Sequence, residues 1–100
     1  MNEQKPIGID LNLEAEVAQG RYSNLVIITH STSEFVLDFA AMLPGIQKPE
    51  VHSRIILTPE HAKRLLLSLQ DNISRYETNV GRIEIPQLQG GSVTPMNKVV

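Results

Sequence analysis

The spacing of apolar residues changes once along this chain, and that change limits its fold more than any other feature. Before residue 58, four apolar runs bounded by turn residues have the length and composition of β-strands. They span residues 9–17, 22–30, 34–42 and 51–57. After residue 58, apolar residues recur every three or four positions, which is the spacing of an amphipathic helix. The sequence therefore predicts an α+β fold with the order β-β-β-β-α.

The predicted first strand alternates strictly between apolar and polar residues. Its apolar positions are Ile9, Leu11, Leu13, Ala15 and Val17. Its polar side carries the acids Asp10, Glu14 and Glu16, so that side is expected to meet water or a basic partner.

The predicted sheet is mainly antiparallel, because the links between its first three strands are short. The loop at 43–50 is longer, so the fourth strand is free to lie at either edge. The second, third and fourth strands carry apolar residues on both faces. In the third strand, the carboxylate of Asp38 is expected to face solvent or to pair with Arg54.

The predicted helix begins with Thr58 as N-cap and Pro59 at its first position, and Gly81 ends it. Its apolar residues form a seam with the intervals of heptad a and d positions. The seam consists of Ala62, Leu66, Leu69, Ile73, Tyr76 and Val80, with Leu65 at its flank. Leu67 lies more than about 100° away from the seam around the helix axis.

One helix cannot cover both faces of such a sheet. A helix over 59–80 is about 33 Å long and 10 Å across, and it covers about half of one face of a sheet about 19 Å wide. The exposed apolar face predicts a homodimer. The candidate oligomer interface consists of Val26, Ile28, Val36, Ala40 and Ile56. The alternative is that the two chain ends fold back over the open face.

Composition and charge limit the domain organisation and the location of the chain. Residues 1–8 are predicted to be a flexible leader, 9–85 a single α+β domain and 86–100 a flexible tail. The absence of cysteine excludes disulfides, cysteine-ligated zinc and a thiol nucleophile. Because the sequence shows neither a signal peptide nor an apolar run of membrane length, we expect a cytoplasmic protein without a membrane partner.

No spacing typical of a catalytic or cofactor site occurs in the sequence. His30, His52 and His61 do not have the spacing of a metal motif. Ser31 and Ser33 lie near His30 and Asp38, but they lack the G-x-S-x-G turn that presents a nucleophile. We therefore expect no catalytic residue, no cofactor and no metal, and a protein that is not an enzyme.

The only basic stripe lies on the predicted helix. Arg64, Arg75 and Arg82 fall near one azimuth with Lys63 beside them, and Asp71 is expected to pair with Arg75. The formal net charge of the chain is −2, which weighs against nucleic-acid binding. A dimer would double the stripe, so these four basic residues are the candidate nucleic-acid contacts in the alternative interpretation.

Three motifs resemble a small bacterial family. They are Tyr22-Ser-Asn-Leu, then Ser33-Glu-Phe-Val-Leu-Asp-Phe39, then Arg54-Ile-Ile-Leu-Thr-Pro-Glu-His-Ala-Lys-Arg-Leu65. The segment over 72–81 also resembles this family. The family is a domain of unknown function, number three-four-six-seven in that series, and the chain resembles its Bacteroidetes members. The resemblance covers residues 9–85. It implies a compact α+β domain and brings no established activity and no catalytic residues.

Taken together, these features predict a non-enzymatic, self-associating module that binds another protein. The alternative is a nucleic-acid-binding regulator that uses the basic helix face of a dimer. A third interpretation is a small enzyme or ligand binder with a pocket at the dimer seam.

Overall fold

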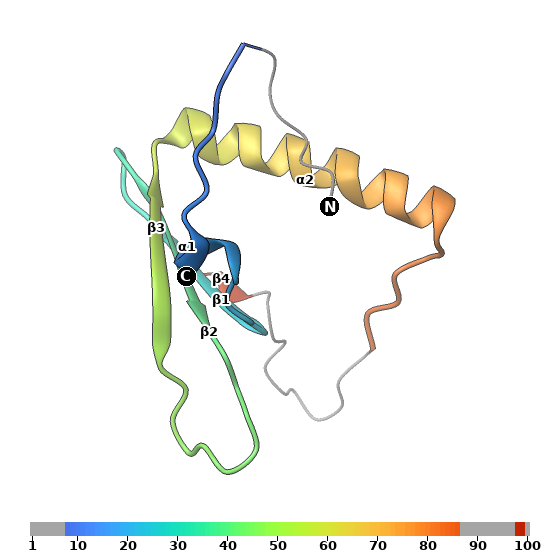
Figure 1. The fold of residues 1–100 in the computed structure, drawn as a ribbon. Coiled ribbons are helices and arrows are strands. Elements are labelled where there is room, and N and C mark those ends of the chain that lie inside the picture. The colour runs from blue at the N-terminus through green and yellow to red at the C-terminus, as the bar shows by residue number, and fades with distance from the viewer. Residues whose placement is uncertain (1–7, 87–97, 100) are drawn as a thin grey trace.

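The computed structural model describes residues 8–86 and 98–99, and it shows an α+β fold (Figure 1). The chain forms α1 (Ala15–Ala18), β1 (Leu25–His30), β2 (Phe35–Ala40), β3 (Val51–Leu57), α2 (Pro59–Asn79) and β4 (Lys98–Val99). The predicted α+β class and the single long helix after the strands are confirmed.

The sheet has the order β3-β2-β1-β4. β1 and β3 both pair antiparallel with β2, so the mainly antiparallel sheet is confirmed and β3 lies at one edge. Of the meander predicted over 9–17, 22–30 and 34–42, only the pairing between the last two strands forms. The two-residue β4 pairs parallel with β1 through Ile27 and Ile28, and the sequence analysis predicted no strand there. Nearly all of the predicted leader and tail lies outside the described residues.

The predicted strand over 9–17 is wrong, so the four-stranded set proposed from the sequence does not form. Residues 9–14 lie outside any helix or strand, and Ala15 to Ala18 form the short α1. The apolar residues of this segment, Ile9, Leu11, Leu13 and Val17, are exposed. A strand needs a neighbour to accept its backbone hydrogen bonds, and no described strand pairs with this segment.

The helix begins and ends where its capping residues predict. Thr58 has an extended backbone, and its Oγ1 accepts a hydrogen bond from the backbone N–H of His61 at 3.3 Å. Pro59 occupies the first turn, where the missing N–H costs nothing. Val80 is the C-cap, and Gly81 follows with φ of +157°, a value that favours glycine.

The strand register gives the sheet two distinct faces, because residues opposite each other point to the same side. We call one the helix-side face, since most of it lines a space shared with α2. It comprises Val26, Ile28, His30, Phe35, Leu37, Phe39, Ser53, Ile55 and Leu57. We call the other the outer face, which comprises Leu25, Ile27, Thr29, Val36, Asp38, Ala40, Arg54 and Ile56.

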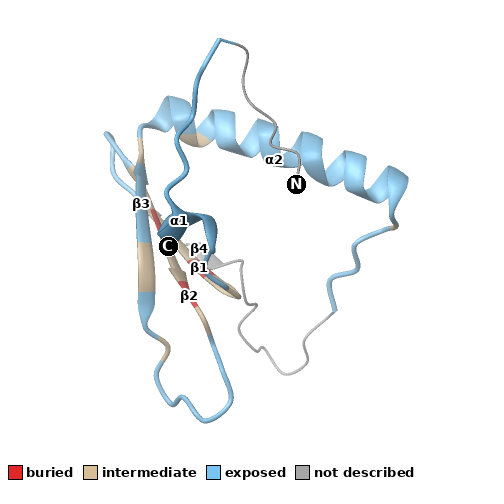
Figure 2. Ribbon diagram, in the orientation of Figure 1, coloured by how far each residue is buried: buried red, intermediate tan, exposed pale blue. Residues whose placement is uncertain are grey.

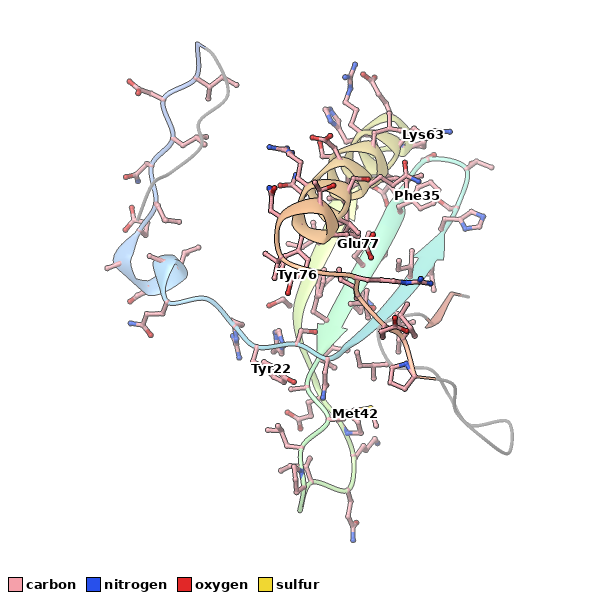
Figure 3. The ribbon with its side chains drawn as sticks, turned by 90° about the vertical axis from the view of Figure 1, so that its right-hand side faces the viewer. Tyr22, Phe35, Met42, Lys63, Tyr76 and Glu77 are labelled. Carbon is pink, nitrogen blue, oxygen red and sulfur yellow. The ribbon has the colours of Figure 1, made fainter. Side chains whose placement is uncertain are left out.

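α2 projects from the sheet instead of lying along it. Figure 1 shows α2 leaving the end of β3 and running away from the sheet, and the view turned by 90° in Figure 3 looks nearly along its axis. No residue of α2 is buried. Figure 2 places the buried residues on β1 and β2, and these are Val26, Leu37 and Ala40. Within the described residues, the single chain thus has a very small core.

No helix in residues 8–86 is long and apolar enough to cross a membrane.

Candidate interaction surface

A large apolar gap separates α2 from the helix-side face of the sheet. Its volume is about 720 Å³. The sheet lines it with Val26, Ile28, Phe35, Leu37 and Phe39, and α2 lines it with Pro59, Ala62, Lys63, Leu65, Leu66 and Leu69. Lys63 is the one charged residue among them. The lining is almost entirely apolar, which is the chemistry that suits apolar side chains of a partner.

The seam predicted on α2 faces this gap only along its first half. Ala62, Leu66 and Leu69 line the gap, whereas Ile73 and Tyr76 do not. In Figure 3, Tyr76 and Glu77 lie near the end of α2 that points away from the sheet. All the large apolar residues of the seam are exposed in the single chain. The seam from Ala62 to Val80 is thus an unpacked apolar surface about 27 Å long at 1.5 Å per residue.

The five residues predicted as the oligomer interface do not share one face. Val26 and Ile28 belong to the helix-side face and line the gap. Val36, Ala40 and Ile56 belong to the outer face. The sequence analysis placed all five on one side because it counted each strand separately. The register puts Ile28 opposite Leu37 and Thr29 opposite Val36, which separates the two groups.

An ion pair lies in the middle of the outer face, which is one of the two alternatives that the sequence left open for Asp38. Asp38 and Arg54 are opposite each other on β2 and β3. Arg54 donates from Nε to Oδ1 at 2.7 Å and from Nη2 to Oδ2 at 2.9 Å. The hydrogen bond from Arg54 lowers the pKa of Asp38 from its ordinary 3.8, although partial burial opposes the shift. The pair therefore stabilises the fold above pH 3.8, and this contribution is lost as the pH falls through the lowered pKa.

The Arg54→Met substitution is expected to raise the pKa of Asp38, since it removes the hydrogen bond and leaves the opposing effect of burial. An acid titration followed by ¹³C NMR of the Asp38 carboxyl carbon measures this change. Arg64→Met is the matched control, because Arg64 pairs with Glu60 on α2 and not with Asp38. A wild-type Asp38 that titrates at 3.8 would contradict the assignment.

The basic stripe of α2 is largely neutralised by neighbouring acids. Arg64 pairs with Glu60 at 2.9 Å, and Arg75 pairs with Asp71 at 2.6 Å as predicted. Arg82 lies beyond the end of α2 and approaches Glu84 at 3.5 Å. Lys63 lines the apolar gap and forms no ion pair with any described residue. Three of the four basic residues of the predicted stripe therefore have an acidic neighbour.

The three histidines lie apart. His30 stacks on Phe35 with ring centroids 5.2 Å apart. Nε2 of His52 bonds the backbone oxygen of Tyr22 at 3.0 Å. His61 lies on the other flank of α2, where it lines a second hollow of about 470 Å³. Across residues 8–86, no three His, Asp or Glu side chains come together in a way that could hold a metal.

Two polar residues, which the sequence analysis named only as part of the Tyr22-Ser-Asn-Leu motif, hold the end of the sheet near residue 24. Asn24 donates from Nδ2 to the backbone oxygen of Met42 at 3.0 Å and accepts from the Met42 N–H at 2.7 Å. Ser23 donates from Oγ to the backbone oxygen of Ala40 at 2.9 Å. These bonds extend the β1–β2 pairing by two residues. The motif gave these two residues no structural role, and a short polar run just before an apolar strand is the signal that could have suggested one.

No curated protein and no solved structure matches the chain. A family model does match, and it covers residues 1–85 of the 100 residues. This match confirms the resemblance carried by the motifs at residues 22, 33 and 54. The description of the family assigns no activity, so the physical features of the surface are the only guide to function. The chain belongs to the family described as protein of unknown function DUF3467.

Proposed function

We propose that this protein is a non-enzymatic, self-associating interaction module of the cytoplasm. Two copies bury the helix-side face and the seam of α2 against each other. The homodimer then binds another protein.

One observation carries this proposal: the apolar gap of about 720 Å³ faces an apolar helix seam, and neither is packed. Soluble monomers avoid apolar surfaces of this extent. The small core of the single chain supports the same conclusion, because only Val26, Leu37 and Ala40 are buried among the described residues. Obligate dimers of this kind often have no stable folded monomer.

The segment over 9–17 supports a role in binding another protein. It presents exposed apolar residues together with Asp10, Glu14 and Glu16. An acidic surface of this kind steers a basic partner and fixes its orientation. The nucleic-acid alternative has no comparable support, because Arg64, Arg75 and Arg82 already have acidic neighbours.

Size-exclusion chromatography with light scattering, run over a dilution series, tests the self-association. We expect a mass close to twice 11.1 kDa at micromolar concentrations. We also expect the thermal unfolding midpoint to rise with protein concentration, since association and folding are linked. A mass of 11.1 kDa at every concentration, with an unfolding midpoint that does not depend on concentration, would overturn the proposal.

A further inference from the structure

We infer that α2 pairs with α2 of a second copy as an antiparallel two-helix coiled coil, with Lys63 of each chain opposite Glu77 of the other. This inference rests on the self-association proposed above and specifies its geometry. The apolar gap between α2 and the sheet is then filled by the far half of the partner helix.

The seam of α2 is complementary to itself when the helix is reversed. Its intervals of four, three, four, three and four place Leu66, Ile73 and Val80 at a positions and Ala62, Leu69 and Tyr76 at d positions. In an antiparallel pair, each a residue faces a d residue of the other helix. A two-fold axis at the level of Asp71 gives three kinds of layer, each formed twice. These are Ala62 with Val80, Leu66 with Tyr76, and Leu69 with Ile73.

This register uses every seam residue and places the smallest ones at the ends. Layers near the ends of α2 combine Ala62 with Val80, which lets the partner helix approach the sheet closely. The next layers bring Tyr76 of the partner beside Leu66, which already lines the gap. Side chains that stand free in the single chain thereby enter the apolar space beside the helix-side face.

Charges at the edges of the seam fit the same register. Lys63, Gln70 and Glu77 occupy the e positions, which face the e positions of the partner in an antiparallel pair. With the axis at Asp71, each Lys63 lies opposite the partner's Glu77, and Gln70 lies opposite Gln70. Lys63 has no acidic partner among the described residues of its own chain. A parallel pair would instead place Asn72 beside Glu77 and leave Lys63 without an acid, so the antiparallel arrangement is favoured.

Reversal of one charge at a time tests this register. In the Lys63→Glu variant, residues 63 and 77 are both acids, and in the Glu77→Lys variant they are both lysines. Because residue 63 of each chain faces residue 77 of the other, each of these homodimers contains two like-charged pairs. We expect each variant to raise the dimer dissociation constant by on the order of tenfold. An equimolar mixture of the two restores both opposite-charge pairs. A His-tagged Lys63→Glu chain is therefore expected to retain untagged Glu77→Lys on a metal column in preference to another copy of itself.

Two control variants isolate the effect of the inferred contact. Arg75→Glu makes the same change of charge away from the seam of α2, beside Asp71, and is expected to leave the dimer unchanged. In the wild type, the side chain of Glu77 accepts a hydrogen bond from the backbone N–H of Ile83 at 3.0 Å. Glu77→Gln removes the charge but keeps an oxygen that can accept this bond. The variant therefore separates the effect of losing the charge from the effect of losing the bond.

The outcomes distinguish this inference from the broader proposal. A wild-type protein that stays monomeric removes the basis of both. A stable wild-type dimer that is unaffected by either charge reversal, with no preference for the mixed pair, overturns the coiled-coil register and leaves self-association standing.

Discussion

The Ile28→Glu substitution is expected to abolish the dimer. Ile28 lies on the helix-side face and lines the apolar gap next to α2. When the second copy closes this gap, the new carboxylate is left in an apolar environment, and Lys63, the one charged residue of the lining, is already paired with Glu77 of the other chain in the inferred dimer. An unpaired buried charge costs about 3–5 kcal/mol per site, and the dimer has two such sites. Light scattering is expected to show a mass of 11.1 kDa, accompanied by loss of cooperative unfolding if the monomer is not stable alone.

Ile56→Glu is the matched control for that experiment. It makes the same chemical change on the outer face, where Ile56 is 54% exposed and lies beside Arg54 on the same strand. We expect both the dimer and its unfolding midpoint to be preserved. If Ile56→Glu dissociates the dimer and Ile28→Glu does not, the outer face is the interface and the proposed arrangement is wrong.

The contrast between these two isoleucines shows where sequence reasoning was sufficient and where it was not. The boundaries of β3 and α2 follow from local chemistry: Thr58 caps the helix, Pro59 fits its first turn, and Gly81 permits its end. The Asp38–Arg54 pair was also predictable, because adjacent antiparallel strands bring such charges together. The face on which Ile28 and Val36 each lie depends on strand register, and a shift of one residue exchanges the faces. Periodicity within one strand cannot supply that register.

The segment over 9–17 shows a second limit. Its strict alternation is a property of the segment alone, whereas a strand also needs a neighbouring edge to which it can bond. In the structure, Ala15 to Ala18 instead form α1, and Gly20 then turns the chain with φ of +77°. Likewise, the sequence correctly predicted a seam on α2 but not that α2 leaves the sheet after its first turns. The apolar pattern of a helix indicates which side it buries, but not the direction in which the helix leaves the preceding strand.

The most discriminating test of the α2 interface compares two leucines that differ little in the single chain. Leu69 is 52% exposed and Leu67 is 55% exposed, so a monomer would lose nearly the same packing from either substitution to alanine. In the inferred dimer, Leu69 faces Ile73 of the partner near the two-fold axis, whereas Leu67 points away from the seam. Leu69→Ala is therefore expected to cost about 2–5 kcal/mol at each of two sites. Leu67→Ala is expected to change stability by no more than about 0.5 kcal/mol.

Sedimentation equilibrium measures this difference as a dissociation constant. At 1.4 kcal/mol per factor of ten, Leu69→Ala is expected to weaken the dimer by at least about three orders of magnitude, and Leu67→Ala is expected to leave it near the wild-type value. Far-ultraviolet circular dichroism at high protein concentration checks that both variants retain the helix. Equal effects of the two substitutions would mean that α2 does not associate through its seam. The exposed apolar surface of α2 would then be a site for a different partner, and the gap of about 720 Å³ beside it would be the place to look for that partner's side chains.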